Sequence, residues 1–287
     1  MVKFQEDIHQ YTNSKEEVYL SATSLIHKYA ADFDSDYWSM YKAIEELDSN
    51  FKKNKKVYLT LKTTEYLLSV IPYQLTKDNI LEGQQKILKE WKVKNDASKI
   101  KGTAFHKGKE NAILNSNNIT FENASHKVQD YKVMFENKSL KELRDVNYYD
   151  SLPDGYYSEL LLFHHGYKIA GTADVVVIKS DDKGNRFVLV DDFKTNQEIK
   201  TENRFQKMKH PLQYLDDCNY NHYNLQTSLY GYLLECMGFK VIHTRITWID
   251  SAQNEIPFIF EYKRQQVISM LEHYTANKNI EAFLKLN

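Results

Sequence analysis

The stretch "KIAGTADVVVIKSDDKGNRFVLVDDFKT", Lys168 to Thr195, decides the fold expected of this chain. Two runs rich in β-branched and aromatic residues flank the turn sequence "SDDKGN", a pattern typical of antiparallel strands joined by a short connection. The first run carries Asp174, directly after "GTA", and the second ends with Asp192 and Lys194. The sequence therefore predicts a strand pair with charged groups at one end.

The spacing of these charged residues indicates a site rather than three separate surface groups. Asp192 and Lys194 are two residues apart, so in a strand both leave the same face while Phe193 points to the other. Asp174 begins the preceding strand, and in an antiparallel pair the two aspartates could converge on one cation. Carboxylates this close repel unless a cation lies between them. Mg²⁺ or Mn²⁺ beside a lysine suits phosphodiester hydrolysis.

Two helical segments carry further candidates. In "GTAFHKGKE", His106 and Glu110 are one turn apart on one helix face, and an imidazole would favour Mn²⁺. In the helix after the strands, Tyr223, Gln226 and Tyr230 line one face, where an amide can bind a phosphate or a base and a ring can stack on an unpaired base. These tyrosines could equally be amphipathic core residues.

The period of the hydrophobic pattern changes along the chain. From about residue 24 to residue 143 apolar residues recur every three or four positions, which predicts helices over 35–49, 76–94, 96–115 and 125–139. From Tyr156 short strands predominate, followed by a helix that ends at Gly238, two more strands, and one or two C-terminal helices. We expect an α/β (α+β) fold with a central mixed sheet flanked by helices. A helical region over 1–100 would pack on a core over 101–287.

Composition narrows the classes of protein. The chain has 287 residues and a formal net charge of −1, so any nucleic-acid surface must be local. Lysine-rich stretches that could form one, or simply solvated helix faces, are 51–62, 86–102 and 204–210. No membrane span or secretory signal is expected, which predicts a cytoplasmic protein. The two cysteines cannot build a disulfide framework or a four-thiolate cluster, and structural zinc and iron-sulfur sites are not expected.

Four motifs in order resemble the PD-(D/E)XK nuclease superfamily in its RecB-like exonuclease branch, which includes recombination nucleases and the mitochondrial genome maintenance exonuclease. They are "GTAFH" (102–106), "GTAD" (171–174), "DFK" (192–194) and "QTSLY" (226–230), within about 101–238. Two departures are Ala173, where the superfamily name has proline, and Asp191, an added acid that a register error could exchange for Asp192.

The resemblance implies a restriction-endonuclease-like core and assigns roles to the motif residues. The metal ligands would be His106, Asp174, Asp192 and the Phe193 carbonyl, with Lys194 as the catalytic lysine; Gln226 and Tyr230 would hold the DNA strand, and Glu159 would have a supporting role. By helix spacing rather than by resemblance, Glu110 is a further candidate for catalysis and Tyr223 for the DNA contact.

The function expected from the sequence is that of a DNA nuclease that uses Mg²⁺ or Mn²⁺. An exonuclease acting on single strands or duplex ends, in recombination, repair or phage DNA processing, is favoured because stacking aromatics suit an unpaired strand. A recombination protein is a further candidate partner. Two alternatives stay open: a nucleic-acid-binding module of nuclease fold without turnover, and an RNA-directed nuclease. The sequence does not indicate polarity or oligomeric state.

Overall fold

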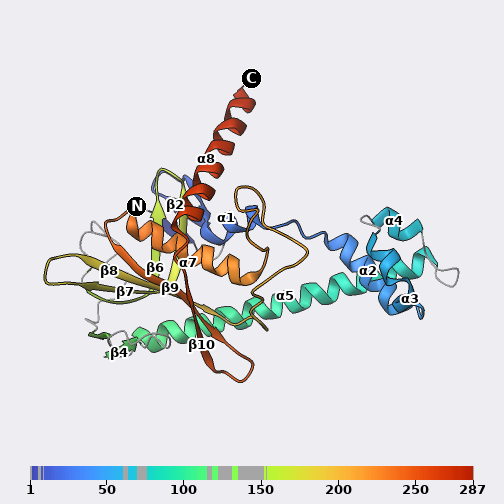
Figure 1. Cartoon of the computed structure of the whole chain (residues 1–287), viewed down its shortest axis with the longest axis horizontal. Coiled ribbons are helices and arrows are strands. Elements are labelled where there is room, and N and C mark those ends of the chain that lie inside the picture. The colour runs from blue at the N-terminus through green and yellow to red at the C-terminus, as the bar shows by residue number, and fades with distance from the viewer. Residues whose placement is uncertain are drawn as a thin grey trace. The chain divides into compact units, whose positions relative to one another are not determined.

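The computed structural model describes residues 2–5, 8, 10–60, 64–69, 76–114, 118–121, 131–134, 152 and 154–286. The chain divides into two compact units (Figure 1). One unit combines Met1–Ala31 with Ala104–Asn287, and the other is Asp32–Thr103. The helical region expected over 1–100 is not one unit, because Met1–Ala31 belong to the unit that contains the sheet.

The Asp32–Thr103 unit is helical, as the hydrophobic period predicts. It contains α2 (Ser35–Leu47), α3 (Phe51–Thr60), α4 (Thr64–Ser69) and the first part of α5 (Lys77–Leu114). Asp34 caps α2 by accepting a hydrogen bond from the Tyr37 amide at 2.8 Å. Met40, Ile44 and Ile80 are fully buried in a separate hydrophobic core, so this unit has its own packing.

Helix α5 is one helix of 38 residues, where the sequence analysis expected separate helices over 76–94 and 96–115. The junction of these segments, "KNDA" (94–97), contains neither proline nor glycine, so nothing in the backbone requires the helix to stop there. The two expected helices are therefore continuous.

The other unit is built on a mixed sheet of eight strands. Seven follow the order β1-β2-β3-β7-β8-β9-β10, and β6 pairs with β7. Their bounds are β1 (Val2–Gln5), β2 (Gln10–Asn13), β3 (Val18–Ser21), β6 (Gly155–His164), β7 (Ile169–Ser180), β8 (Arg186–Lys194), β9 (Lys240–Ile249) and β10 (Glu255–Phe260). The pairs β3·β7 and β8·β9 are parallel and the others antiparallel. The expected mixed sheet is confirmed.

Strand β7 creates an opening in the sheet. One of its edges pairs with β6 over its length, from Ile169 to Ile178. Its other edge pairs with β3 at residues 169–170 and with β8 from Val175 onward. Among the described residues, no strand pairs with the segment Gly171–Asp174 on that side. Beyond Asp191, β8 continues beside β9 alone, so β7 and β8 separate into a fork.

Helices cover both faces of this sheet. On one face, α1 (Ala22–Tyr29), α7 (Asn219–Glu235) and α8 (Arg264–Leu286) form a common core with the strands, as Figure 1 shows for α7. Leu225 and Leu229 of α7 are fully buried there. On the other face, Phe105 of α5 packs with Phe193 and its neighbours. The α+β arrangement, a sheet flanked by helices, matches the sequence-based expectation.

Several elements differ from the predictions in detail. The strands β1 to β3 were not predicted, because segments of four residues are too short to show a hydrophobic period. Their residues Val2, Tyr11 and Tyr19 are buried against Leu161 and Ala170. The helix expected over 125–139 is wrong at Tyr131–Met134, which is strand β5 paired with β4 (Asn118–Phe121). The rest of that prediction lies outside the described residues. Helix α7 does end before Gly238, whose φ of 89° is the predicted left-handed stop.

No helix in the described part of the chain combines the length and apolar character that a membrane span requires.

Candidate functional site

Asp174 lies in the fork between β7 and β8. It is in the middle of β7 rather than at a strand start, because β7 already begins at Ile169. Its Oδ2 accepts a hydrogen bond from the Phe193 amide at 2.6 Å and lies 3.1 Å from the His106 Nδ1. The site is therefore held by two neighbouring strands and by α5.

Glu159 completes a group of three potential metal ligands. One donor atom each from His106, Glu159 and Asp174 lie within 4.8 Å of one another. Glu159 stands opposite Asp174 in the β6·β7 register, between the pairs Ser158↔Val175 and Leu160↔Ala173. Its φ of 53° is unusual for a residue with a side chain, and such strain costs about 1–3 kcal/mol and concentrates at functional sites.

The electrostatics of this group favour a bound cation. Burial and the charge of Asp174 raise the pKa of Glu159 to about 8. Burial and Asp174 also raise the pKa of Asp192 to about 6, against the lowering effect of Lys194. Although burial lowers it, the hydrogen bond to Asp174 and the nearby carboxylates raise the pKa of His106. A divalent ion would relieve this carboxylate repulsion.

Asp192 and Lys194 form a second group on the same face, as predicted. The Lys194 ammonium makes an ion pair with Asp192 Oδ2 and donates to Gln226 Oε1 at 3.1 Å. The Gln226 amide nitrogen donates to Asp192 Oδ1 at 3.2 Å and to the Tyr230 hydroxyl at 3.1 Å. Asp192 is 2% exposed, and among the described residues its Oδ2 has no partner besides Lys194. Helix α7 thus fixes both members of the pair.

The predicted role of the tyrosines in stacking on a base does not fit Tyr230. Its ring is 3% exposed, and its hydroxyl is engaged with Gln226. Tyr223 is half-buried, and its ring lies 4.8 Å from the Lys194 ammonium in a cation–π contact. Tyr223 thus contacts the lysine, and Tyr230 holds the glutamine. The spacing that predicted a DNA contact here is also that of a helix face packed on a sheet.

The side chains of Asp191 and Asp192 point to opposite faces of the sheet. Asp191 is buried on the face opposite to Asp192, where its Oδ2 accepts from Arg245 Nε and from Thr247 Oγ1, each at 2.8 Å. The register is therefore the one that pairs Asp192 with Lys194. Arg245 and Thr247 were not identified from the sequence; the available signal was a charged residue within the strand run "VIHTRITWI".

The remaining predicted residues divide between the site and its surroundings. Glu110 pairs with Lys107 at 2.5 Å and lies outside the three-ligand group, although its charge affects Glu159. Phe193 contributes its amide to Asp174 and buries its ring beside Phe105. Glu159, given only a supporting role from sequence, is instead a member of the group.

Gly171 provides the space that Tyr230 needs. A Cβ atom at this position would lie 2.7 Å from Tyr230 Cε1 and 3.1 Å from the Ala22 Cβ. Because the Tyr230 ring is buried, Gly171→Ala should lower the free energy of unfolding by roughly 1–3 kcal/mol, measured by denaturant titration. Gly108→Ala, within helix α5, is the control. A Cβ atom at position 108 would meet no atom within 4 Å outside the nearby helix backbone, so this change should stabilise the protein by about 0.5–1 kcal/mol. Equal effects of the two changes would refute the packing argument.

The comparisons with known proteins add little. No protein-family model matches this chain, and no curated protein matches it. Among solved structures the chain is similar to one titled "Crystal structure of SSO0001", with 10% sequence identity, 89% of this chain and 83% of that chain covered, and a TM-score of 0.27. A likeness this weak carries no argument about function.

Proposed function

We propose that this chain is a metal-dependent DNA nuclease with a restriction-endonuclease-like core, of the RecB-like exonuclease type. The observation that carries the proposal is the convergence of His106, Glu159 and Asp174 in a sheet fork, with the ion pair of Asp192 and Lys194 on the same strand pair. An imidazole, two carboxylates and a fixed ammonium are the groups that phosphodiester hydrolysis requires.

The three ligands suit a small divalent ion. Carboxylate oxygens suit Mg²⁺ and Mn²⁺, and the imidazole of His106 adds a preference for Mn²⁺. The raised pKa values of Glu159 and His106 indicate that the group is poorly neutralised by protein partners alone. An ion held here would polarise a phosphoryl oxygen and lower the pKa of a bound water.

The chain's own residues then orient and stabilise the reacting phosphate. The Lys194 ammonium is held by Asp192, by Gln226 and by the Tyr223 ring, so it needs little reorganisation to face a developing negative charge. Asp174 is held by the Phe193 amide and by His106, which fixes its carboxylate in the fork. These contacts pre-organise the site before substrate arrives.

An unpaired DNA strand is the favoured substrate. Phe205, in the connection between β8 and α7, is 95% exposed and follows the exposed Arg204. An exposed aromatic ring beside a guanidinium is suited to stacking on an unpaired base near a phosphate. This surface supports action on single strands or frayed ends more than on an intact duplex.

The test is digestion of linear single-stranded and duplex DNA, each end-labelled, with Mn²⁺, Mg²⁺ or a chelator. We expect hydrolysis with either ion, faster with Mn²⁺, and none with the chelator. Mn²⁺ should also raise the melting temperature, because an ion that binds only the folded state stabilises it. An RNA strand of the same sequence distinguishes an RNA-directed enzyme. DNA binding without hydrolysis under both ions would contradict the proposal and favour a binding module.

Glu159→Gln and Glu110→Gln form the matched pair for the metal. Loss of a direct ligand at 159 should raise the Mn²⁺ concentration for half-maximal stabilisation at least about tenfold, since outer-shell changes alone cost roughly 10–100-fold. The Glu110 variant should titrate like the wild type, because Glu110 is paired with Lys107. If the Glu110 variant were the weaker binder of the two, the glutamate that binds the metal would be Glu110 of α5 and not Glu159 of β6.

A further inference from the structure

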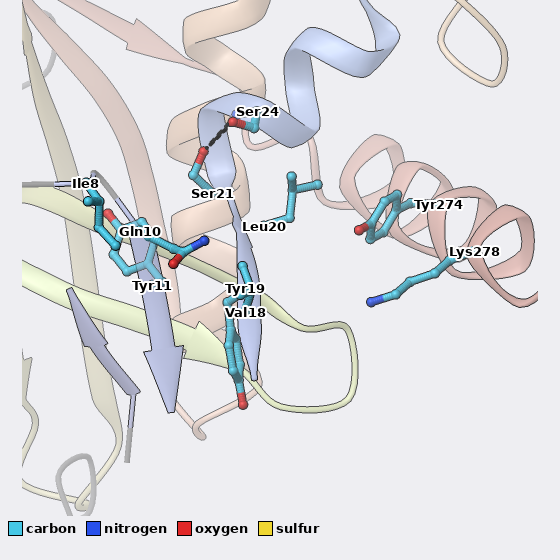
Figure 2. Close-up of a pocket in the computed structure, with 10 residues that line it drawn as sticks. All are labelled: Ile8, Gln10, Tyr11, Val18, Tyr19, Leu20, Ser21, Ser24, Tyr274 and Lys278. Atoms are coloured by element: carbon cyan, nitrogen blue, oxygen red, sulfur yellow. Dashed lines mark hydrogen bonds between the residues drawn. The ribbon is translucent and has the colours of Figure 1, made fainter. Parts of the chain in front are cut away.

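A cavity lies in the same unit as the group of His106, Glu159 and Asp174, which is called the acid cluster below. It has a volume of about 330 Å³ and is lined by β2, β3, the start of α1 and the last helix α8 (Figure 2). This is in the size range of small-molecule sites, roughly 300–1,000 Å³. It therefore has room for one small organic ligand or one unit of a polymer.

The floor of this pocket is aromatic. Tyr11 and Tyr19 are buried, and their hydroxyls are already engaged, with Thr172 at 3.1 Å and with His165 Nδ1 at 2.5 Å respectively. With 7% and 2% of their surface exposed, these two residues close the floor of the pocket and offer a ligand little ring surface. Tyr274 of α8 provides a ring on the opposite wall. An aromatic wall of this kind suits a flat, π-rich group.

Two polar side chains supply specificity. Lys278 points from α8 toward β3 in Figure 2 and makes no ion pair with any side chain that the structure describes. Gln10 of β2 likewise makes no side-chain hydrogen bond within the described residues, and its amide can both donate and accept. A cation and an amide near aromatic rings match a ligand with a planar hydrogen-bonding ring and an anionic group.

Tyr11 connects this pocket to the acid cluster. Its hydroxyl bonds Thr172, which is two residues before Asp174 on the segment of β7 between its β3 and β8 ladders. Burial raises the pKa of Tyr11, and the charge of Glu159 adds to that effect. On the same segment, Gly171 lies against Ala22 at the start of α1, next to Ser21 of the pocket wall. A ligand in the pocket would thus be a close neighbour of the phosphate in the site.

We propose that this pocket binds one deoxynucleotide unit of the substrate strand, next to the phosphate that reacts. The base lies against the ring of Tyr274, its edge meets the Gln10 amide, and a phosphate meets Lys278. This assignment rests on the proposed nuclease function. It explains why a cationic, aromatic cavity is placed beside a cluster of acids, because the strand must be held where the acids alone would repel it.

The probe is deoxyadenosine 5′-monophosphate, titrated calorimetrically into the full chain with chelator present so that metal binding does not contribute. Lys278→Gln should weaken this binding about tenfold, and Gln10→Ala several-fold, by loss of a charge-assisted and a neutral hydrogen bond. Deoxyadenosine, which lacks the phosphate, should bind the wild type and Lys278→Gln equally. Lys28→Gln removes an exposed lysine of α1 outside the pocket and should leave both affinities unchanged.

The outcomes separate this inference from the nuclease proposal. If the wild type cleaves DNA with Mn²⁺ but binds no mononucleotide, the pocket assignment is wrong and the nuclease proposal stands. The same holds if Lys278→Gln and Lys28→Gln change mononucleotide affinity alike. Mononucleotide binding with the expected pattern but no cleavage supports the pocket and overturns the nuclease. Neither binding nor cleavage overturns both. Melting temperatures of the variants verify that each is folded.

Discussion

Replacing Asp192 with Asn, or Lys194 with Met, is expected to lower DNA hydrolysis by about 10²–10³-fold or more, while DNA binding stays near the wild-type level. Lys194→Met keeps the apolar stem and removes the ammonium that would face the developing charge on phosphate. Asp192→Asn keeps the shape and removes the carboxylate that holds this ammonium and adjoins Asp174. Single-turnover cleavage of a labelled strand measures the loss.

Lys200→Met is the matched control for the lysine. Lys200 follows the same strand, but it is exposed and pairs only with the exposed Glu198 at 3.1 Å. Such surface pairs contribute about 0–1 kcal/mol to stability, so this variant should cleave and unfold like the wild type. Full activity of Lys194→Met would remove the lysine from the chemistry. Loss of binding in parallel with cleavage would instead assign Lys194 to holding the strand.

The sheet could be predicted from sequence where the strands are long and end in recognisable turns. The runs that became β7 and β8 carry β-branched residues on both sides of "SDDKGN", and their antiparallel pairing is confirmed. The first three strands have four residues each, too few for a period of two to be recognised. They are stabilised by burial of Val2, Tyr11 and Tyr19 against distant residues, which no local pattern shows.

The site could be predicted only in part. The two-residue spacing of Asp192 and Lys194 correctly predicted that both lie on one face. The one-turn spacing within "GTAFHKGKE" identified His106, but it did not show that Glu110 would pair with Lys107 outside the three-ligand group. The place of Glu159 depends on a left-handed backbone opposite Asp174, a tertiary feature. Tyr230 resembled a ligand-binding aromatic, but the absence of a side chain at Gly171 lets it pack into the core.

The contacts of Gln226 and Tyr230 indicate a structural role in place of the DNA contact expected from the sequence. Gln226 bonds Asp192, Lys194 and Tyr230 at once, so it acts as a positioning residue for the ion pair. The buried hydroxyl of Tyr230 fixes the Gln226 amide in turn. Pre-organisation by a buried polar network of this kind is worth more than the sum of its separate bonds.

Arg245→Met is expected to lower the free energy of unfolding by about 3–5 kcal/mol, since it leaves a carboxylate buried without its partner. Arg245 Nε and a terminal nitrogen both lie 2.8 Å from Asp191 Oδ2, and Asp191 is 1% exposed. Burial raises the pKa of Asp191, and Arg245 is the main group that opposes this effect. Chemical denaturation of the variant and the wild type in parallel measures the loss.

Two further variants decide whether the loss comes from the unpaired charge. Arg264→Met removes a guanidinium at the same 2.7–2.8 Å range from a carboxylate, that of Glu235, but at a half-exposed position, and it should cost under about 1 kcal/mol. The double variant Asp191→Asn with Arg245→Met removes both charges of this pair and should recover much of the stability. If the double variant were as unstable as Arg245→Met alone, lost packing of the arginine stem would be the cause. Because the Asp192 amide donates to Asp191 at 3.0 Å, the single variant should also lose nuclease activity.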